Sequence, residues 1–255
     1  MARPARWIEE DIKDGIGIIR LSSWKYFSTY VHDEMLDYPN YIWRGQENSN
    51  WLLEPTLDRV LKKQKSVNEK AVKRHLESFK YSVRGRRGSN PPRLEKENDW
   101  WALGQHYGLA TPLLDWSNSP FVAAFFAFQN ENCDSEYRSI YSLNIKSVIR
   151  KSKNSNENSS IVESIRPLSD ENSRLVNQNG EFTRFPLGID IEKWISKHFK
   201  GRDTTYILMK ILIPSKDRDS CMRNLNRMNI NYLTLFPDLF GSTNYCNHKL
   251  TIKGY

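Results

Sequence analysis

Two blocks of sequence about 60 residues apart place polar side chains in strongly apolar and aromatic surroundings. The first is Tyr-Ile-Trp-Arg-Gly-Gln at residues 41–46. The second is Gln-His-Tyr-Gly at 105–108, followed by Leu-Leu-Asp-Trp-Ser-Asn-Ser-Pro at 113–120. Burying the charged or polar members of these blocks costs several kcal/mol unless each is paired or bound to something. We therefore expect a polar site between the two blocks.

Arg44 ends a short β-prone run and is followed by Gly45, which would let a ligand approach the backbone. A guanidinium at such a position can hold a phosphate or a carboxylate with two hydrogen bonds. The alternative is an internal ion pair, with Asp115 as the partner. The two roles are compatible, because a pairing carboxylate can orient an arginine that also binds a phosphate.

His106 stands in a short segment with Gln, Tyr and Asp neighbours. A single histidine is usually structural and satisfied by a backbone carbonyl. In this company, however, His106 could also orient a ligand or act as a general base.

Ser117 and Ser119 immediately precede a helix expected from Pro120 onward. Their simplest role is to cap that helix. A helix N-terminus also favours anions, so a phosphate site there is physically reasonable.

The net charge of +8 is unevenly placed along the chain. Residues 59–96 contain 13 Lys and Arg against 3 Asp and Glu, a net charge of +10, so the remainder sums to −2. Such a segment suits an acidic partner, either nucleic acid or an acidic antitoxin or regulatory protein. The alternative is a solvated basic surface without a partner. The candidate nucleic-acid contacts are Lys73, Arg84, Arg86, Arg87 and Arg93.

The composition is that of a folded chain with room for one sizeable core, because it has 255 residues and eight Trp. No run approaches the roughly 18 apolar residues of a membrane span, and the start lacks the apolar core of a signal peptide. The three cysteines and five histidines show no metal-ligand spacing. We expect a cytoplasmic protein without a metal or a membrane contact.

Hydrophobic periodicity predicts the elements that would position these residues. Strands are expected at 15–21, 41–44, 137–145, 161–165 and 205–213. Helices are expected at 22–36, 57–64, 68–83, 99–107, 121–128, 189–198 and 216–228, with a short helix or turn at 172–177. Gly, Pro, Ser and Asn content predicts a flexible loop at 84–92 and a mobile loop at about 151–160. The irregular alternation favours a single α+β domain with a mixed sheet core and a basic helical insertion at about 59–96.

The two blocks resemble the FRG domain family, which is named for its aromatic-Arg-Gly signature. Three further pieces fit the same family: Trp-Leu-Leu-Glu-Pro-Thr-Leu at 51–57, Gln-Asn-Gly-Glu-Phe at 178–182 and Leu-Phe-Pro-Asp-Leu-Phe-Gly at 235–241. The resemblance covers roughly residues 20–241 and implies one FRG domain over residues 1–255. The blocks are specific for the family and much less specific for an activity.

A second, weaker resemblance is to ADP-ribosyltransferases of the Arg-Ser-Glu type. In those enzymes the arginine of an aromatic-Arg-Gly strand end holds a phosphate of NAD. A Ser-Thr-Ser strand and an Ala-x-x-Phe-Ala helix follow, and a later strand carries the catalytic glutamate. Here Ser-Asn-Ser at 117–119 and Ala-Phe-Phe-Ala at 124–127 are similar in order and spacing. Gln178 and Glu181 are the candidates for the third element, although no clean Glu-x-Glu or Gln-x-Glu is present.

These resemblances imply an ADP-ribosyltransferase-like fold and an NAD-dependent ADP-ribosyltransferase that acts as a toxin or anti-phage defence effector. NAD would be the substrate, and nucleic acid, with RNA favoured, would be the acceptor. The alternatives are a non-enzymatic module that binds nucleic acid or a nucleotide, and a nuclease toxin. The expected catalytic residues are Glu181, Gln178 and His106, and the expected NAD-binding residues are Arg44, Gly45, Gln46, Tyr107, Asp115, Ser117 and Ser119.

Overall fold

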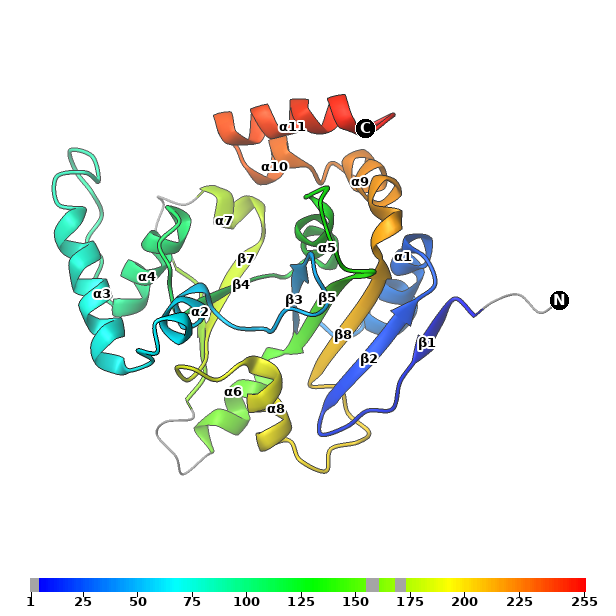
Figure 1. Cartoon of the computed structure of the whole chain (residues 1–255), viewed down its shortest axis with the longest axis horizontal. Coiled ribbons are helices and arrows are strands. Elements are labelled where there is room, and N and C mark those ends of the chain that lie inside the picture. The colour runs from blue at the N-terminus through cyan, green and yellow to red at the C-terminus, as the bar shows by residue number, and fades with distance from the viewer. Residues whose placement is uncertain (1–4, 155–160, 168–172) are drawn as a thin grey trace.

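The computed structural model describes residues 5–154, 161–167 and 173–255. In these ranges, eight strands form one sheet in the order β1-β2-β8-β5-β3-β4-β7-β6 (Figure 1). The β2–β8 pair is parallel, and every other neighbouring pair is antiparallel. The strands are β1 (Trp7–Glu9), β2 (Ile16–Leu21), β3 (Tyr41–Gln46), β4 (Leu113–Ser117), β5 (Tyr137–Asn144), β6 (Glu163–Ile165), β7 (Gly180–Arg184) and β8 (Leu208–Pro214).

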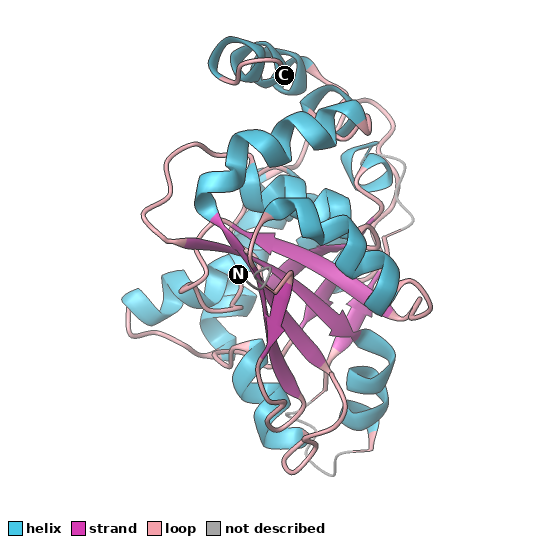
Figure 2. Ribbon diagram, turned by 90° about the vertical axis from the view of Figure 1, so that its right-hand side faces the viewer, coloured by secondary structure: helices cyan, strands magenta, loops and turns pink. Residues whose placement is uncertain are grey.

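Helices lie on both faces of the sheet, which makes the predicted α+β class correct (Figure 2). The helical segment after β2 changes its type along its length. It begins as the 3-10 helix η1 (Trp24–Tyr26), continues as α1 (Phe27–Tyr30) and ends as the π-helix η2 (Val31–Met35). The other helices in the described ranges are α2 (Thr56–Lys63), α3 (Glu69–Ser82), α4 (Glu97–His106), α5 (Pro120–Phe128), α6 (Ile145–Lys153), α7 (Ser173–Asn177), α8 (Ile191–His198), α9 (Arg218–Arg227), α10 (Tyr232–Leu235) and α11 (Leu239–Thr251).

Three apolar clusters hold these layers together. The first joins β2, β3, β5 and β8 to α1, α5 and α9 on one face of the sheet. The second joins the other face to α6 and α8. The third packs α2, α3 and α4 against β4, β6 and β7 at the far end of the sheet. The third cluster carries the second sequence block, because α4 ends at His106 and β4 contains Asp115.

The central helix α5 is buried almost all round, as its sequence predicts. Ser119 caps it by accepting a hydrogen bond from the Val122 amide at 3.3 Å. The helix packs directly on β3 at Gly45, where a Cβ atom would lie 1.9 Å from the carbonyl oxygen of Ala123. The glycine of the first block is therefore required by helix packing. Gly45 also lines the main cavity, and its role in the approach of a ligand stays a prediction.

The sequence patterns missed β1, β4, β7, α6, α10 and α11. Strand β4 lies between β3 and β7 and is buried at four of its five positions, so it lacks the alternation of a half-buried strand. The loop predicted at 151–160 is wrong for residues 151–153, which form the last turn of α6. The buried apolar residues of α6, Ile145 and Val148, precede the Ser/Asn/Lys run. Only the polar last turn of α6 falls within the segment that was predicted as a loop. Residues 155–160 lie outside the described part.

Candidate functional site

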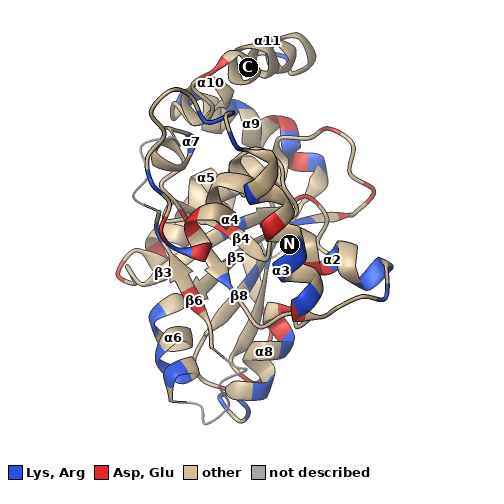
Figure 3. Ribbon diagram, turned by 90° about the vertical axis from the view of Figure 1, so that its left-hand side faces the viewer, with Lys and Arg blue, Asp and Glu red and all other residues tan. Residues whose placement is uncertain are grey.

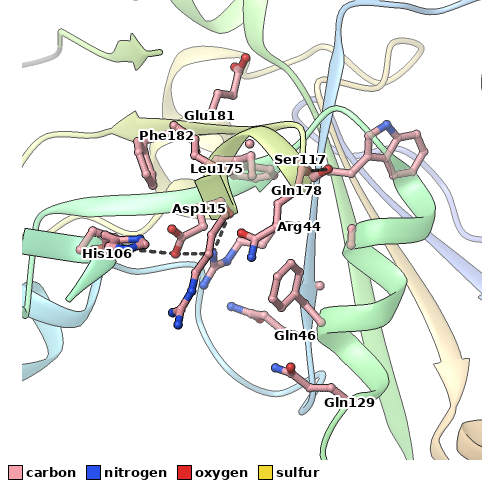
Figure 4. Close-up of a pocket in the computed structure, with 18 of the residues that line it drawn as sticks. Arg44, Gln46, His106, Asp115, Ser117, Gln129, Leu175, Gln178, Glu181 and Phe182 are labelled. Atoms are coloured by element: carbon pink, nitrogen blue, oxygen red, sulfur yellow. Dashed lines mark hydrogen bonds and ion pairs between the residues drawn. The ribbon is translucent and has the colours of Figure 1, made fainter. Parts of the chain in front are cut away.

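A cavity of about 390 Å³ opens where β3, β4 and β7 lie side by side (Figure 4). Residues of α2, α4, α5 and α7 complete its wall. Strand order brings together three pieces that are far apart in the sequence: the block at 41–46, the block at 105–117 and the segment at 178–182. The expected polar site between the two blocks is therefore present as a cavity.

Arg44 projects from β3 into this cavity with 21% of its side chain exposed. Its Nη1 donates to the backbone oxygen of Asp115 at 2.7 Å and lies 3.8 Å from the Asp115 carboxylate. That carboxylate also accepts a hydrogen bond from Nε2 of Gln105 at 2.8 Å. The predicted Arg44–Asp115 pair is confirmed. The 58% exposure of Asp115 leaves the pair accessible to a ligand.

Arg59 on α2 is a second guanidinium at the cavity, and the sequence blocks gave no indication of it. Burial lowers the pKa of Arg44, the Asp115 carboxylate raises it, and the nearby charge of Arg59 lowers it further. Arg44 and Arg59 thus bring two positive charges to a cavity whose lining also includes the carboxylates of Glu47, Asp115 and Glu181. The part of the wall around the two guanidiniums is where an anion would bind. A third arginine, Arg174 of α7, lines the cavity but is paired with Asp238.

Gln46 lines the cavity and is buried. Its Nε2 donates to the carbonyl oxygen of Leu52 at 3.2 Å. This bond anchors the segment that carries Trp51, whose half-exposed ring is part of the cavity wall. Gln46 therefore shapes the site through the following loop, and its role in NAD binding stays a prediction.

His106 lines the cavity at the end of α4, whereas Tyr107 lies outside it. The two rings touch edge to face, with centroids 4.7 Å apart. Tyr107 is 72% exposed and lines a separate groove. Tyr107 follows the last residue of α4, and its ring turns from the cavity toward the α3 side of the hairpin. The expectation that both side chains contact one ligand is corrected for Tyr107.

Ser117 and Ser119 have different roles. Ser117 is buried at the cavity, and its Oγ donates to the backbone oxygen of Gln178 at 2.7 Å. Oγ of Ser117 also accepts a hydrogen bond from the Ser119 amide at 3.0 Å. Ser119 caps α5 and does not line the cavity. The capping interpretation is confirmed for Ser119, while Ser117 fastens the end of β4 to the segment before β7.

Glu181 belongs to a strand that borders the cavity, but its carboxylate faces the other side of the sheet. In the β4–β7 register Asp115 is opposite Phe182, and Trp116 is opposite Glu181. Because side chains alternate along a strand, Glu181 and Asp115 point to opposite faces. Glu181 is fully buried and ion-paired with Arg166, and Figure 4 shows it pointing away from Arg44. Glu181 is therefore not placed as the catalytic carboxylate that we expected.

Gln178 does line the cavity, at the turn that leads into β7. Its Nε2 donates to the carbonyl oxygen of Leu235 at 3.1 Å. This bond fixes the amide near Phe236, another residue of the cavity wall. Both candidates for the third element are among the residues that line the cavity, but the carboxylate of Glu181 is held in the ion pair with Arg166.

The basic segment 59–96 contains α3 and the loop that leads to α4, and α3, this loop and α4 form a basic hairpin that projects from the end of the sheet (Figure 1). Lysines and arginines follow this region and α2 in Figure 3. Of the predicted nucleic-acid contacts, Lys73, Arg84, Arg86 and Arg93 are exposed. Arg87 is half-buried and donates to the carbonyl oxygen of Pro92 at 2.7 Å, with its guanidinium 5.3 Å from the centre of the Trp100 ring.

Within the described ranges, no three His, Cys, Asp or Glu side chains are grouped so that they could hold a metal ion. The expectation that no metal is needed stays a prediction. No helix in these ranges is long and apolar enough to cross a membrane. Cys133, Cys221 and Cys246 are free thiols.

Comparison with known proteins gives one match. The model of the FRG domain family matches residues 39–136, which include β3, β4, α5 and both sequence blocks. A search of curated proteins and a search of solved structures returned no match.

Proposed function

We propose that the protein is an NAD-dependent ADP-ribosyltransferase whose site is this cavity, built in part by residues 39–136, which match the FRG domain model. One observation carries the proposal: the Arg44 strand, the Ser117 strand and the Gln178 segment lie side by side around one cavity. These are the three elements that the resemblance to Arg-Ser-Glu transferases identifies. The family match by itself says nothing about the reaction.

The cavity fits a phosphorylated aromatic molecule. Arg44 and Arg59 supply two positive charges for a diphosphate, and arginine suits phosphate because it can donate two parallel hydrogen bonds. Trp51, Phe126 and Phe236 supply ring faces and edges against which a base or a nicotinamide could pack. NAD combines these groups, so it is the substrate that we propose.

In the proposed reaction the bond between the ribose C1′ and the nicotinamide nitrogen breaks, and nicotinamide leaves with the bonding electrons. The acceptor atom then bonds to C1′ and gives up its proton. A carboxylate beside the ribose would stabilise the positive charge that develops at C1′. Asp115 is the carboxylate that the geometry offers, because it faces the cavity and is oriented by Gln105 and Arg44. His106 also lines the cavity, and we propose it as the base that takes the proton of the acceptor.

The proposed acceptor is nucleic acid, with RNA favoured, because the basic hairpin adjoins the α4 end of the cavity. Modification of RNA would make the protein a toxin or an anti-phage defence effector. An acidic antitoxin could cover the same basic surface. The free thiols suit the reducing cytoplasm in which such an effector would act.

A second candidate function, a non-enzymatic nucleotide-binding module, is favoured by one observation. The resemblance assigns the catalytic role to a glutamate, and Glu181 points away from the cavity into an ion pair with Arg166. Such a module would hold the same nucleotide through Arg44 and Arg59 without breaking a bond.

Incubation of the purified chain with NAD labelled in its adenylate part, together with separate pools of RNA, DNA and protein, tests both candidates. We expect nicotinamide release and label in the RNA pool, with both lost in Arg44→Ala. Arg20→Ala is the matched control, because Arg20 lies on β2 at the surface in an ion pair with Glu10. Binding of NAD by the folded protein without nicotinamide release would reject the transferase and support the binding module.

A further inference from the structure

A second groove, of about 400 Å³, lies on the basic hairpin beside the main cavity. Phe79 and Val83 of the α3 end and Leu103 of α4 form its apolar part. Tyr107, Arg86 and Arg87 form the rest, together with Gly88. We propose that this groove binds an unpaired base of single-stranded RNA and is the acceptor subsite. The acceptor role rests on the proposed transferase function, whereas the RNA binding does not.

The ring of Tyr107 is the stacking surface. It is 72% exposed, although tyrosine in a soluble protein usually buries most of its ring. Edge-to-face contact with the His106 ring at 4.7 Å holds it in place. Bases stack on such aromatic side chains irrespective of sequence, because every base presents a π-face.

The charge of the groove complements a phosphate backbone. Arg86 is exposed, and Arg87 is held by the Pro92 carbonyl and the Trp100 ring, so its guanidinium is preordered. No Asp or Glu is among the described residues that line the groove. A neutral apolar partner would gain nothing from this arrangement. A strongly acidic chain with exposed rings, which is what single-stranded RNA is, matches both parts of the groove.

The position of the groove connects it to the main cavity. His106 lines the cavity, Tyr107 lines the groove, and the two are adjacent in sequence with their rings in contact. A base stacked on Tyr107 would therefore lie within one residue of the side chain proposed to deprotonate the acceptor. RNA extending from the groove toward His106 would present its next nucleotide to the cavity.

Fluorescence anisotropy with a short labelled single-stranded RNA, the full chain and no NAD tests the groove. We expect Tyr107→Ala to weaken binding by roughly fivefold or more and Tyr107→Phe to retain it, because stacking needs the ring and not the hydroxyl. Arg86→Glu should weaken binding and flatten its dependence on salt. The matched control is Tyr81→Ala. Tyr81 is 69% exposed on α3, but two residues from Phe79 and thus on the opposite side of the helix.

Thermal unfolding of each variant verifies that the fold survives. Unchanged RNA affinity in folded Tyr107→Ala, or an equal loss of affinity in Tyr81→Ala, would overturn the assignment of the groove as an RNA-binding site. Equal affinity for single-stranded DNA of the same sequence would overturn the assignment to RNA. Tighter binding of an acidic peptide that displaces the RNA would assign the surface to a protein partner instead. If RNA binding depends on Tyr107 but the protein releases no nicotinamide from NAD, the groove is supported as an RNA-binding site. Only the proposed transferase function is then rejected.

Discussion

Replacement of Arg44 by alanine should separate ligand binding from folding. The wild-type side chain makes a charged hydrogen bond to the Asp115 carbonyl, and such bonds contribute about 1.5–3 kcal/mol. Against this, the guanidinium is largely removed from water, its pKa is lowered by burial, and its Nε has no hydrogen-bond partner. Removing a poorly satisfied charge recovers desolvation free energy of similar size. We therefore expect the free energy of unfolding to change by less than about 1 kcal/mol.

The effect of the same substitution on NAD binding should be larger. If Arg44 donates to a phosphate, the loss of about 1.5–3 kcal/mol of charged hydrogen bonding weakens binding by about 10- to 150-fold. Titration calorimetry with NAD measures the affinity, and urea unfolding followed by Trp fluorescence measures the stability. Arg20→Ala should leave the affinity for NAD unchanged, and its effect on stability should also stay within about 1 kcal/mol, since exposed ion pairs contribute about 0–1 kcal/mol.

The reverse pattern would refute this reasoning. A loss of more than about 3 kcal/mol in unfolding free energy, with unchanged affinity in the remaining folded protein, would make Arg44 a structural partner of Asp115. The phosphate role, and with it the proposed NAD site, would then be wrong.

Three further predictions follow from individual contacts. Gly45→Ala should destabilise the protein by about 1–3 kcal/mol in thermal unfolding, because its Cβ would overlap the Ala123 carbonyl; a smaller effect would mean that α5 can shift freely. Arg166→Ala should cost about 2–3 kcal/mol in urea unfolding, because the carboxylate of the fully buried Glu181 loses its charged partner; a loss below about 0.5 kcal/mol would contradict this. Burial lowers the pKa of His248 below 6.5, so the stability that depends on its neutral form is present above that pH and lost as the pH falls through the folded-state pKa. The free energy of unfolding, measured against pH, should therefore fall less steeply below pH 6.5 in His248→Gln than in the wild type. Equal slopes in the two proteins would exclude His248 as the cause.

The parts of the site that the sequence predicted are those set by local pattern. Arg44 and Asp115 each stand among apolar residues, and a buried charge requires a partner, so the sequence offered their pairing as one of two compatible roles of Arg44. The central helix α5 followed from its cap, its proline and its apolar run. The helix depends on neighbours within a few residues, and each of the two charges was recognised from its own apolar neighbours.

The parts that the sequence did not predict depend on contacts between distant segments. Strand β4 is buried on both faces, so its five residues show no period of two. The direction of Glu181 is set by its register with β4, and no property of the segment 178–182 specifies that register. Arg59 reaches the cavity because the third apolar cluster fixes α2 beside β4, whereas its sequence context indicates only a basic surface.

The β4–β7 register also determines which side chains of β7 face the cavity. Phe182 now faces the cavity beside Asp115, and Glu181 is hidden on the reverse face. Because the side-chain period of a strand is two, removing one residue from the turn at 178–179, which leads directly into β7, would exchange the two faces along the whole strand. A homologue with a turn one residue shorter would present a carboxylate where this protein presents an aromatic ring. The length of that turn therefore sets whether the wall of the site is acidic or apolar, and variation in its length could diversify the chemistry of the fold without a substitution on β7.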